Sequence, residues 1–201
     1  MEGGTLGGMG DVSTDPVIAF ESQGTWEAWL EEHHSTSTGV WLKIAKKASG
    51  IPTVTHAEAL DAALCYGWID GQRNRLDDQW FLQRFTPRRA RSNWSKVNVG
   101  KVAELTGQGR MRPAGLREVE RARADGRWDA AYDAPSKATV PDDLQQALDA
   151  NPEAARMFAT LNSQNRFAIL FRVQGAKRPE TRARRIAQFV TMLSEGKTLY
   201  P

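Results

Sequence analysis

The sequence predicts an α+β fold, with a small antiparallel sheet packed by helices in the N-terminal part and an all-helical C-terminal part. Strand-like alternation is confined to the part before residue 88, whereas from residue 142 onward the apolar residues recur at helical spacing. The intervening stretch 129–141 is rich in Ala, Pro and Asp, which is typical of a linker. We therefore expect a disordered Gly-rich arm over 1–15, an α+β domain over 16–128, a linker over 129–141, and a helical region over 142–201 packed on the α+β domain as one compact unit.

Local patterns predict the N-terminal elements in order. Residues 17–20 form a short apolar run that suits a strand, and Ser22 can cap the helix that follows. Apolar and polar residues alternate over 40–46, which is typical of a half-buried strand. Thr55 and Glu58 have the spacing of a capping box, so a second helix begins there.

A hairpin and further helices follow. Residues 68–76 and 79–86 read as two strands, although their turn lacks the Asn-Gly signal. Ser92 or Asn93 is predicted to cap a helix whose apolar stripe begins at Trp94. The remaining predicted helices are one that begins at Pro113, two whose stripes run over 144–148 and 155–161, one capped by Ser163 with its stripe over 167–171, and one over 186–193.

The composition limits the function classes. The net charge of +3 and a pI near 9.2 permit an anionic partner without requiring one. Cys65 is the single cysteine, so no intrachain disulfide can form. The first residues lack the basic and apolar regions of a secretory leader, and no apolar run approaches the roughly 20 residues of a membrane span. We expect a cytoplasmic protein without membrane insertion.

The stretch 66–96 is the most informative part of the chain, because it combines three of the seven Trp with a run of cations. Arginine forks bind phosphate or carboxylate bidentately, and a helix N-terminus favours an anion. This pattern indicates an anion pocket where the hairpin meets the next helix; alternatively, the arginines pair with Asp70, Asp77 and Asp78 as a structural clasp. The candidate pocket residues are Arg84, Arg88, Arg89 and Arg91 with Ser92 and Asn93.

A second candidate group precedes the arginines. Tyr66, Trp68, Asp70 and Gln72 occupy alternate positions and would share one face of a strand. If that face lines a groove, its aromatic walls, carboxylate and amide suit a small polar ligand. If the face is covered by helices, these residues belong to the core.

No catalytic constellation or metal set is recognisable, so we name no catalytic residue, no metal ligand and no cofactor. Cys65 is expected to be a small core side chain, and the three histidines lack the spacing and the partners of a metal site. The basic segment 172–185 suits the solvated face of an amphipathic helix, with a polyanion-binding face as the alternative.

Five segments together carry a resemblance to a known family. They are ALCYGWIDGQ (63–72), LQRFTPRRARSNWSKVN (82–98), GRMRPAGLREVERARADGRWDAAYDAPS (109–136), VPDDLQQAL (140–148) and KRPETRARRIAQFVTMLSEG (177–196). With these segments the chain resembles the YdeI/OmpD-associated, bacteriocin-protection family. The resemblance implies a link to antimicrobial-peptide resistance and, by name only, association with a porin or a peptide.

These observations favour a cytosolic stress- or peptide-protection protein that binds a small anionic ligand at its Arg/Trp-rich hairpin–helix junction. One alternative is a nucleic-acid-binding module that uses the basic clusters, which we do not favour. The other is an enzyme of unrecognised class acting on an anionic metabolite.

Overall fold

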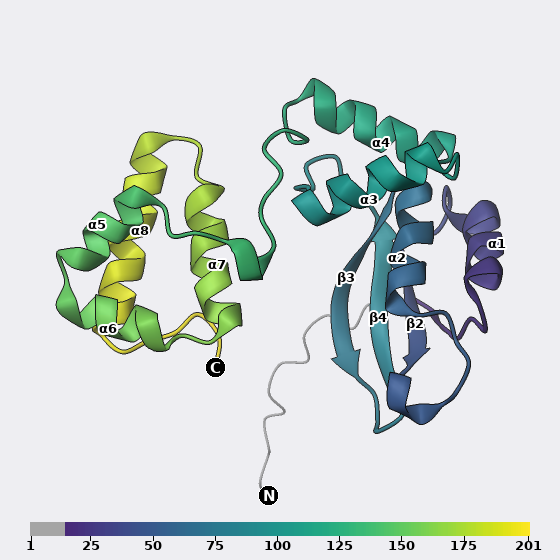
Figure 1. Cartoon of the computed structure of the whole chain (residues 1–201), viewed down its shortest axis with the longest axis horizontal. Coiled ribbons are helices and arrows are strands. Elements are labelled where there is room, and N and C mark those ends of the chain that lie inside the picture. The colour runs from purple at the N-terminus through teal and green to yellow at the C-terminus, as the bar shows by residue number, and fades with distance from the viewer. Residues whose placement is uncertain (1–14) are drawn as a thin grey trace, which may run out of the picture. The chain divides into compact units, whose positions relative to one another are not determined.

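The computed structural model describes residues 15–201, which divide into two compact units. The N-terminal unit comprises the described residues up to Asn93 together with Asn98–Ala130, and the C-terminal unit comprises Trp94–Val97 and Ala131–Pro201. The predicted α+β fold is confirmed, with the sheet in the first unit and helices alone in most of the second (Figure 1). The predicted disordered arm lies outside the described residues except for Asp15.

The sheet has four strands in the order β1-β2-β4-β3. Its strands are β1 (Val17–Ile18), β2 (Val40–Ala45), β3 (Trp68–Arg75) and β4 (Trp80–Pro87). The neighbours β2, β4 and β3 pair antiparallel as predicted, but β1 pairs parallel to β2, so the sheet is mixed. The helix between β1 and β2 explains this difference, because a crossover connection is what parallel neighbours require.

An Asx-type turn closes the β3–β4 hairpin in place of the missing Asn-Gly signal. The Asp77 carboxylate accepts hydrogen bonds from the backbone N–H groups of Gln79 and Trp80, both at 2.8 Å. A short carboxylate side chain can thus satisfy the turn backbone without a glycine.

Helices α1 (Gln23–His33) and α2 (His56–Cys65) lie on one face of the sheet (Figure 1). Both predicted N-caps are confirmed, since Ser22 and Thr55 each accept from the backbone three residues ahead. The covered face holds the largest buried side chains of this unit. They are Trp26, Leu30, Val40, Leu42, Ile44, Leu64, Trp68 and Phe85, each at most 2% exposed.

Helix α3 (Lys96–Gly107) begins later than the sequence predicted, so the cap at Ser92 or Asn93 is wrong. The Ser92 hydroxyl instead accepts from the backbone of Arg89 within a turn. The segment before the helix is extended, because Tyr132 donates its N–H to the carbonyl of Trp94 and accepts from the N–H of Lys96. Trp94 is nevertheless buried, at 2% exposure.

Helix α4 (Pro113–Ala124) begins at its proline as predicted and packs closely on the end of α2. A Cβ atom on Gly115 would stand 2.7 Å from the carbonyl oxygen of Leu64 and nearer still to that of Cys65. Glycine is therefore required at this contact for steric reasons.

The C-terminal unit packs α5 (Asp142–Asp149), α6 (Pro152–Thr160), α7 (Ser163–Gln174) and α8 (Pro179–Ser194) around one apolar core. The predicted cap of α7 is off by one residue, because Asn162 caps it and Ser163 is its first residue. Within residues 15–201, no helix is long and apolar enough to cross a membrane.

Candidate functional site

The two predicted aromatic ligand-binding residues lie in the core of the N-terminal unit. Trp68 is 1% exposed, donates its indole N–H to the carbonyl of His34 at 3.1 Å, and meets the Trp29 ring edge-on at 5.8 Å. Tyr66 precedes the strand, and the left-handed backbone of Gly67 (φ 76°) separates it from Trp68. The predicted alternation from Tyr66 is therefore interrupted before β3 begins.

Tyr66 joins the end of α2 to α1. Its hydroxyl donates to the carboxylate of Glu31 at 2.7 Å, and burial raises the pKa of the phenol. The Arg112 guanidinium lies 5.9 Å from the same ring. This arrangement is a packed polar contact between two helices and a loop.

A β-bulge separates the other two residues of the predicted face. The β3–β4 register shifts between Asp70 and Arg73, so the alternation does not continue from Asp70 to Gln72. The carboxylate of Asp70 lies within hydrogen-bond distance of His56 Nε2, at 3.2 Å. The exposed Gln72 instead donates its amide N–H to the side-chain oxygen of Asn74. Sequence alternation alone could not reveal the extra residue.

The predicted arginines are distributed over different surroundings. Arg84 Nε and Nη2 both donate to one oxygen of Asp15, at 2.8 and 2.6 Å, and that carboxylate is 7% exposed. Arg88 is buried at 7% exposure and donates to the backbone carbonyl of Asn93 at 3.2 Å. Arg84 therefore links β4 to Asp15, and Arg88 links the end of β4 to the backbone at Asn93.

Two cations of the junction point into solvent. Arg89 and Arg91 are exposed, and neither forms an ion pair with any residue in the described range. The turn that contains them is held by Arg127, whose Nη1 donates to the carbonyl of Ser92 at 2.7 Å. Of the predicted pocket, the structure thus has Arg88, Arg89, Arg91, Ser92 and Asn93 in or beside one turn, with Arg84 elsewhere.

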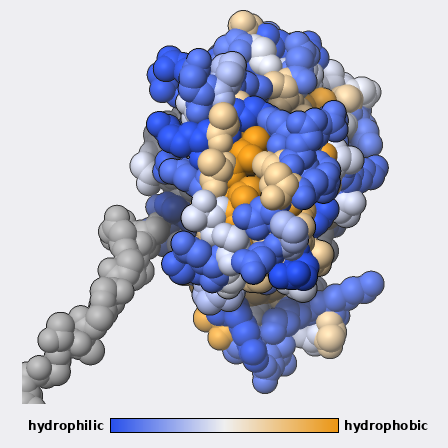
Figure 2. All heavy atoms as spheres, turned by 90° about the vertical axis from the view of Figure 1, so that its left-hand side faces the viewer, coloured by the Kyte–Doolittle hydropathy of each residue, from blue (hydrophilic) through white to orange (hydrophobic). Residues whose placement is uncertain are grey.

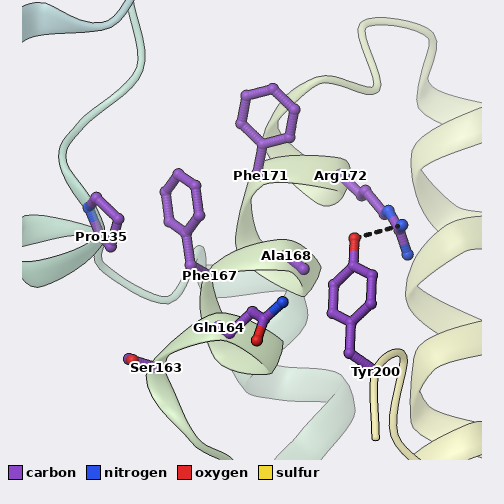
Figure 3. A pocket seen from close by; sticks show the side chains of 8 residues that line it. All are labelled: Pro135, Ser163, Gln164, Phe167, Ala168, Phe171, Arg172 and Tyr200. Carbon is purple, nitrogen blue, oxygen red and sulfur yellow. Dashed lines mark hydrogen bonds between the residues drawn. The ribbon is translucent and has the colours of Figure 1, made fainter. Parts of the chain in front are cut away.

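A well-formed hollow occurs instead in the C-terminal unit, along one face of α7 (Figure 3). We call this hollow the α7 trough; its volume is about 530 Å³. Its floor residues recur at three- and four-residue spacing, so the trough follows the helix for about 12 Å at a rise of 1.5 Å per residue. It is lined by Pro135, Ser163, Gln164, Phe167, Ala168, Phe171, Arg172 and Tyr200.

The trough has an aromatic floor between two walls. Figure 3 shows the rings of Phe167 and Phe171 between Pro135 on one side and Tyr200 on the other. The edge-on ring of Tyr132, 5.0 Å from Phe171, supports the floor. The sequence predicts one apolar stripe of Phe167, Leu170 and Phe171. In the structure Leu170 lies in the core, whereas the two phenylalanines remain partly exposed.

One cation and one hydroxyl stand at the trough wall. Arg172 Nη2 donates to the hydroxyl of Tyr200 at 3.3 Å (Figure 3), and its guanidinium lies 5.8 Å from the centre of that ring. The guanidinium has further N–H groups that a carboxylate or phosphate could bind. An apolar floor with a cation at its edge suits a ligand with an apolar body and an anionic group.

The wall that carries Tyr200 is fixed by a buried amide. Asn165, 2% exposed, accepts from the backbone N–H groups of Leu199 and Tyr200 at 3.0 and 2.9 Å. Its NH₂ group donates to the carbonyl of Tyr200 and to the side chain of Asn162. The C-terminal tail is therefore an ordered wall of the trough.

The basic segment 172–185 is only partly a solvated face. Arg182 Nη1 and Arg185 Nη1 donate to the carbonyls of Val173 and Arg172, and so they cap the C-terminus of α7. The Arg182 guanidinium also holds the pKa of the Asp143 carboxyl below its ordinary value. These two arginines are engaged within the fold rather than available to a polyanion.

The C-terminal unit is basic as a whole. Its residues include eleven Lys and Arg against seven Asp and Glu, which gives a formal net charge of +4. Such an excess favours anionic partners over cationic ones. Among the described residues, no group of three or more His, Cys, Asp or Glu could hold a metal ion.

Comparison with protein families divides the chain at a similar place. Residues 137–196 match the family described as "Bacteriocin-protection, YdeI or OmpD-Associated". Residues 18–118, about half of the chain, match a "Domain of unknown function (DUF8412)". No curated protein and no solved structure gives a significant match. Most residues of the α7 trough thus fall within the bacteriocin-protection match, whereas the hairpin–helix junction falls within the domain of unknown function.

Proposed function

Because residues 137–196 match the YdeI/OmpD-associated, bacteriocin-protection family, we propose that the chain is a protection-associated protein that works by binding an anionic ligand in the α7 trough. The observation that carries this proposal is the aromatic floor with the Arg172 guanidinium at its edge. The ligand it fits best has an aromatic or aliphatic body and one carboxylate or phosphate.

Charge argues for this ligand class over direct capture of a cationic peptide. A unit with a net charge of +4 repels a cationic partner and attracts an anionic one. We therefore place the protective role in binding a small acidic compound, and we place the protein in the cytoplasm, where its single buried thiol needs no oxidising environment.

The hairpin–helix junction is the second candidate for the anion. Arg89 and Arg91 support it, because both are exposed, neither has an ion pair among residues 15–201, and guanidinium groups bind phosphate well. The burial of Trp68 and the engagement of Arg84 with Asp15 weigh against the larger Arg/Trp pocket that the sequence predicts.

A nucleic-acid-binding role has less support than either anion site. Several cations of the predicted basic clusters are already paired, including Lys96 with Asp133 at 2.8 Å and Lys101 with Asp61 at 2.6 Å. Pairing leaves fewer cations to replace the counterions of a phosphate backbone.

The test is a titration of the ¹⁵N-labelled full-length chain with three probes of one shape and different charge. They are 3-phenylpropionate, its neutral amide, and the cationic 3-phenylpropylamine. We expect the carboxylate to bind most tightly and to shift amide signals of α7 and the C-terminal tail. Equal affinity for all three probes would refute an anion-selective trough, and shifts confined to residues 88–93 would move the site to the junction.

A further inference from the structure

A second apolar hollow lies on the C-terminal unit, between α5 and α8. Figure 2 shows this hollow as a hydrophobic depression surrounded by hydrophilic residues. We call it the α5–α8 groove; its volume is about 420 Å³. It is lined by Asp143, Ala147, Pro179, Arg182, Ala183, Ile186, Ala187 and Val190.

The groove follows α8 for three turns. Pro179, Ala183, Ile186 and Val190 have the spacing i, i+4, i+7 and i+11, which covers about 16 Å of helix. Ala183 and Ala187 are exposed although they are apolar. Ile186 belongs to the core of the unit and Val190 packs against that core, so the groove extends the inward-facing apolar side of α8 outward to the exposed Ala183 and Ala187.

Small side chains along the α5–α8 groove determine which partner side chains fit into it. Alanines on α8 and Ala147 on α5 leave room for the side chains of another element to enter between the two helices. A helix laid in such a groove contacts it through residues at i, i+4, i+7 and i+11, the same period as the groove itself.

Exposed cations lie just before α8 and in its second turn, and Glu180 is the one acidic residue of the segment 177–185. Lys177, Arg178 and Arg184 are exposed, and none of them forms an ion pair with a residue of the described chain. The Asp143–Arg182 pair at the groove is already closed, so it adds no free charge. A partner with acidic residues beside its apolar stripe would therefore be attracted to this end of the groove.

We propose that the α5–α8 groove is a docking surface for an acidic amphipathic helix of a partner protein. A second copy of this chain is the poorer occupant, because its own α8 would bring the same cations against these. The proposal concerns a surface separate from the α7 trough, so either can fail while the other holds.

The probe is an 18-residue peptide with Leu at i, i+4, i+7 and i+11, and with Glu, Gln and Ala elsewhere. One control peptide has the same composition with the Leu positions scrambled, and another has Lys in place of Glu. Titration into the ¹⁵N-labelled full-length chain should give saturable shifts at Ala147, Ala183 and Ala187 with the first peptide. Affinity should fall as salt is added.

Two variants locate the contact. Ala187→Glu fills the groove and adds a negative charge at an exposed helix position, so it should weaken peptide binding at least tenfold while leaving the fold intact. Gln188→Glu, exposed on another side of α8, is the matched control and should bind as the parent does. Equal binding of the scrambled or Lys peptide, or unchanged binding to Ala187→Glu, would overturn the proposal. Self-association that Ala187→Glu abolishes would do so as well.

Discussion

Replacing Asn165 with Ala should both destabilise the C-terminal unit and release the wall of the α7 trough. The side chain makes four hydrogen bonds, three of them to Leu199 and Tyr200. At about 1 kcal/mol net for each bond, their loss costs about 4 kcal/mol. Freeing two tail residues returns about 1 kcal/mol of backbone entropy for each, so the free energy of unfolding should fall by about 2 kcal/mol.

Urea denaturation followed by circular dichroism measures this difference, and hydrogen exchange reports the tail directly. The amides of Leu199 and Tyr200 should lose their protection in Asn165→Ala. Gln188→Ala removes an exposed amide from α8 and serves as the control, with an expected change within about 0.5 kcal/mol. Retained protection of the tail amides, or a loss of stability no larger than the control's, would refute the claim that Asn165 holds the C-terminal tail in place.

A carboxylate at position 165 separates the hydrogen bonds that the Asn165 side chain accepts from those that it donates. Asn165→Asp keeps the oxygen that accepts from Leu199 and Tyr200 but faces the carbonyl of Tyr200 with a negative charge. The variant should therefore be least stable near neutral pH and should regain stability as acid protonates the new carboxyl. Stability independent of pH would show that the carbonyl does not face this side chain.

Three further predictions concern packing and ionisation. Gly115→Ala should destabilise the protein by about 1–3 kcal/mol, because the added Cβ meets backbone carbonyls. Gly100→Ala should stabilise it by about 0.4–1 kcal/mol, because nothing lies within 4 Å of the added Cβ. Equal effects of the two substitutions on the free energy of unfolding would contradict this. Burial raises the pKa of the Cys65 thiol to about 11, so native protein should react with a disulfide reagent far more slowly than urea-unfolded protein at pH 8, and similar rates would show exposure. Pairing with Arg182 lowers the pKa of Asp143 in the folded state, so the pair stabilises the fold fully above pH 3.8 and loses this contribution as the pH falls through the lower folded pKa. The difference in unfolding free energy between the parent and Asp143→Asn should therefore disappear at low pH. A difference that does not change with pH would contradict this.

Elements with local signals could be predicted from the sequence. The caps at Ser22 and Thr55 depend on residues within one helical turn, so both helix starts are where the sequence places them. The start of α3 differs from the sequence expectation because the backbone of Trp94 is hydrogen-bonded to Tyr132, which is distant in the sequence. A local capping pattern contains no information about such a partner.

The candidate site shows the same limit. Helical periodicity assigns Phe167 and Phe171 to an apolar stripe, but it does not show what covers that stripe. The trough exists only because Pro135 and Tyr200 come from other segments to form its walls. Conversely, the cluster of arginines was visible in the sequence, but the pairing of Arg84 with Asp15 was not.

The central claim is that the Arg172 guanidinium gives the α7 trough its preference for anions. The most direct test is the dissociation constant of 3-phenylpropionate for the parent chain, Arg172→Gln and Arg156→Gln. The last variant removes the same charge from an exposed position outside the trough. A charge-assisted hydrogen bond contributes about 1.5 kcal/mol, so Arg172→Gln should bind about tenfold more weakly while Arg156→Gln binds as the parent does. Equal weakening by both variants would mean that only the net charge attracts the probe, and unchanged binding by Arg172→Gln would contradict the claim.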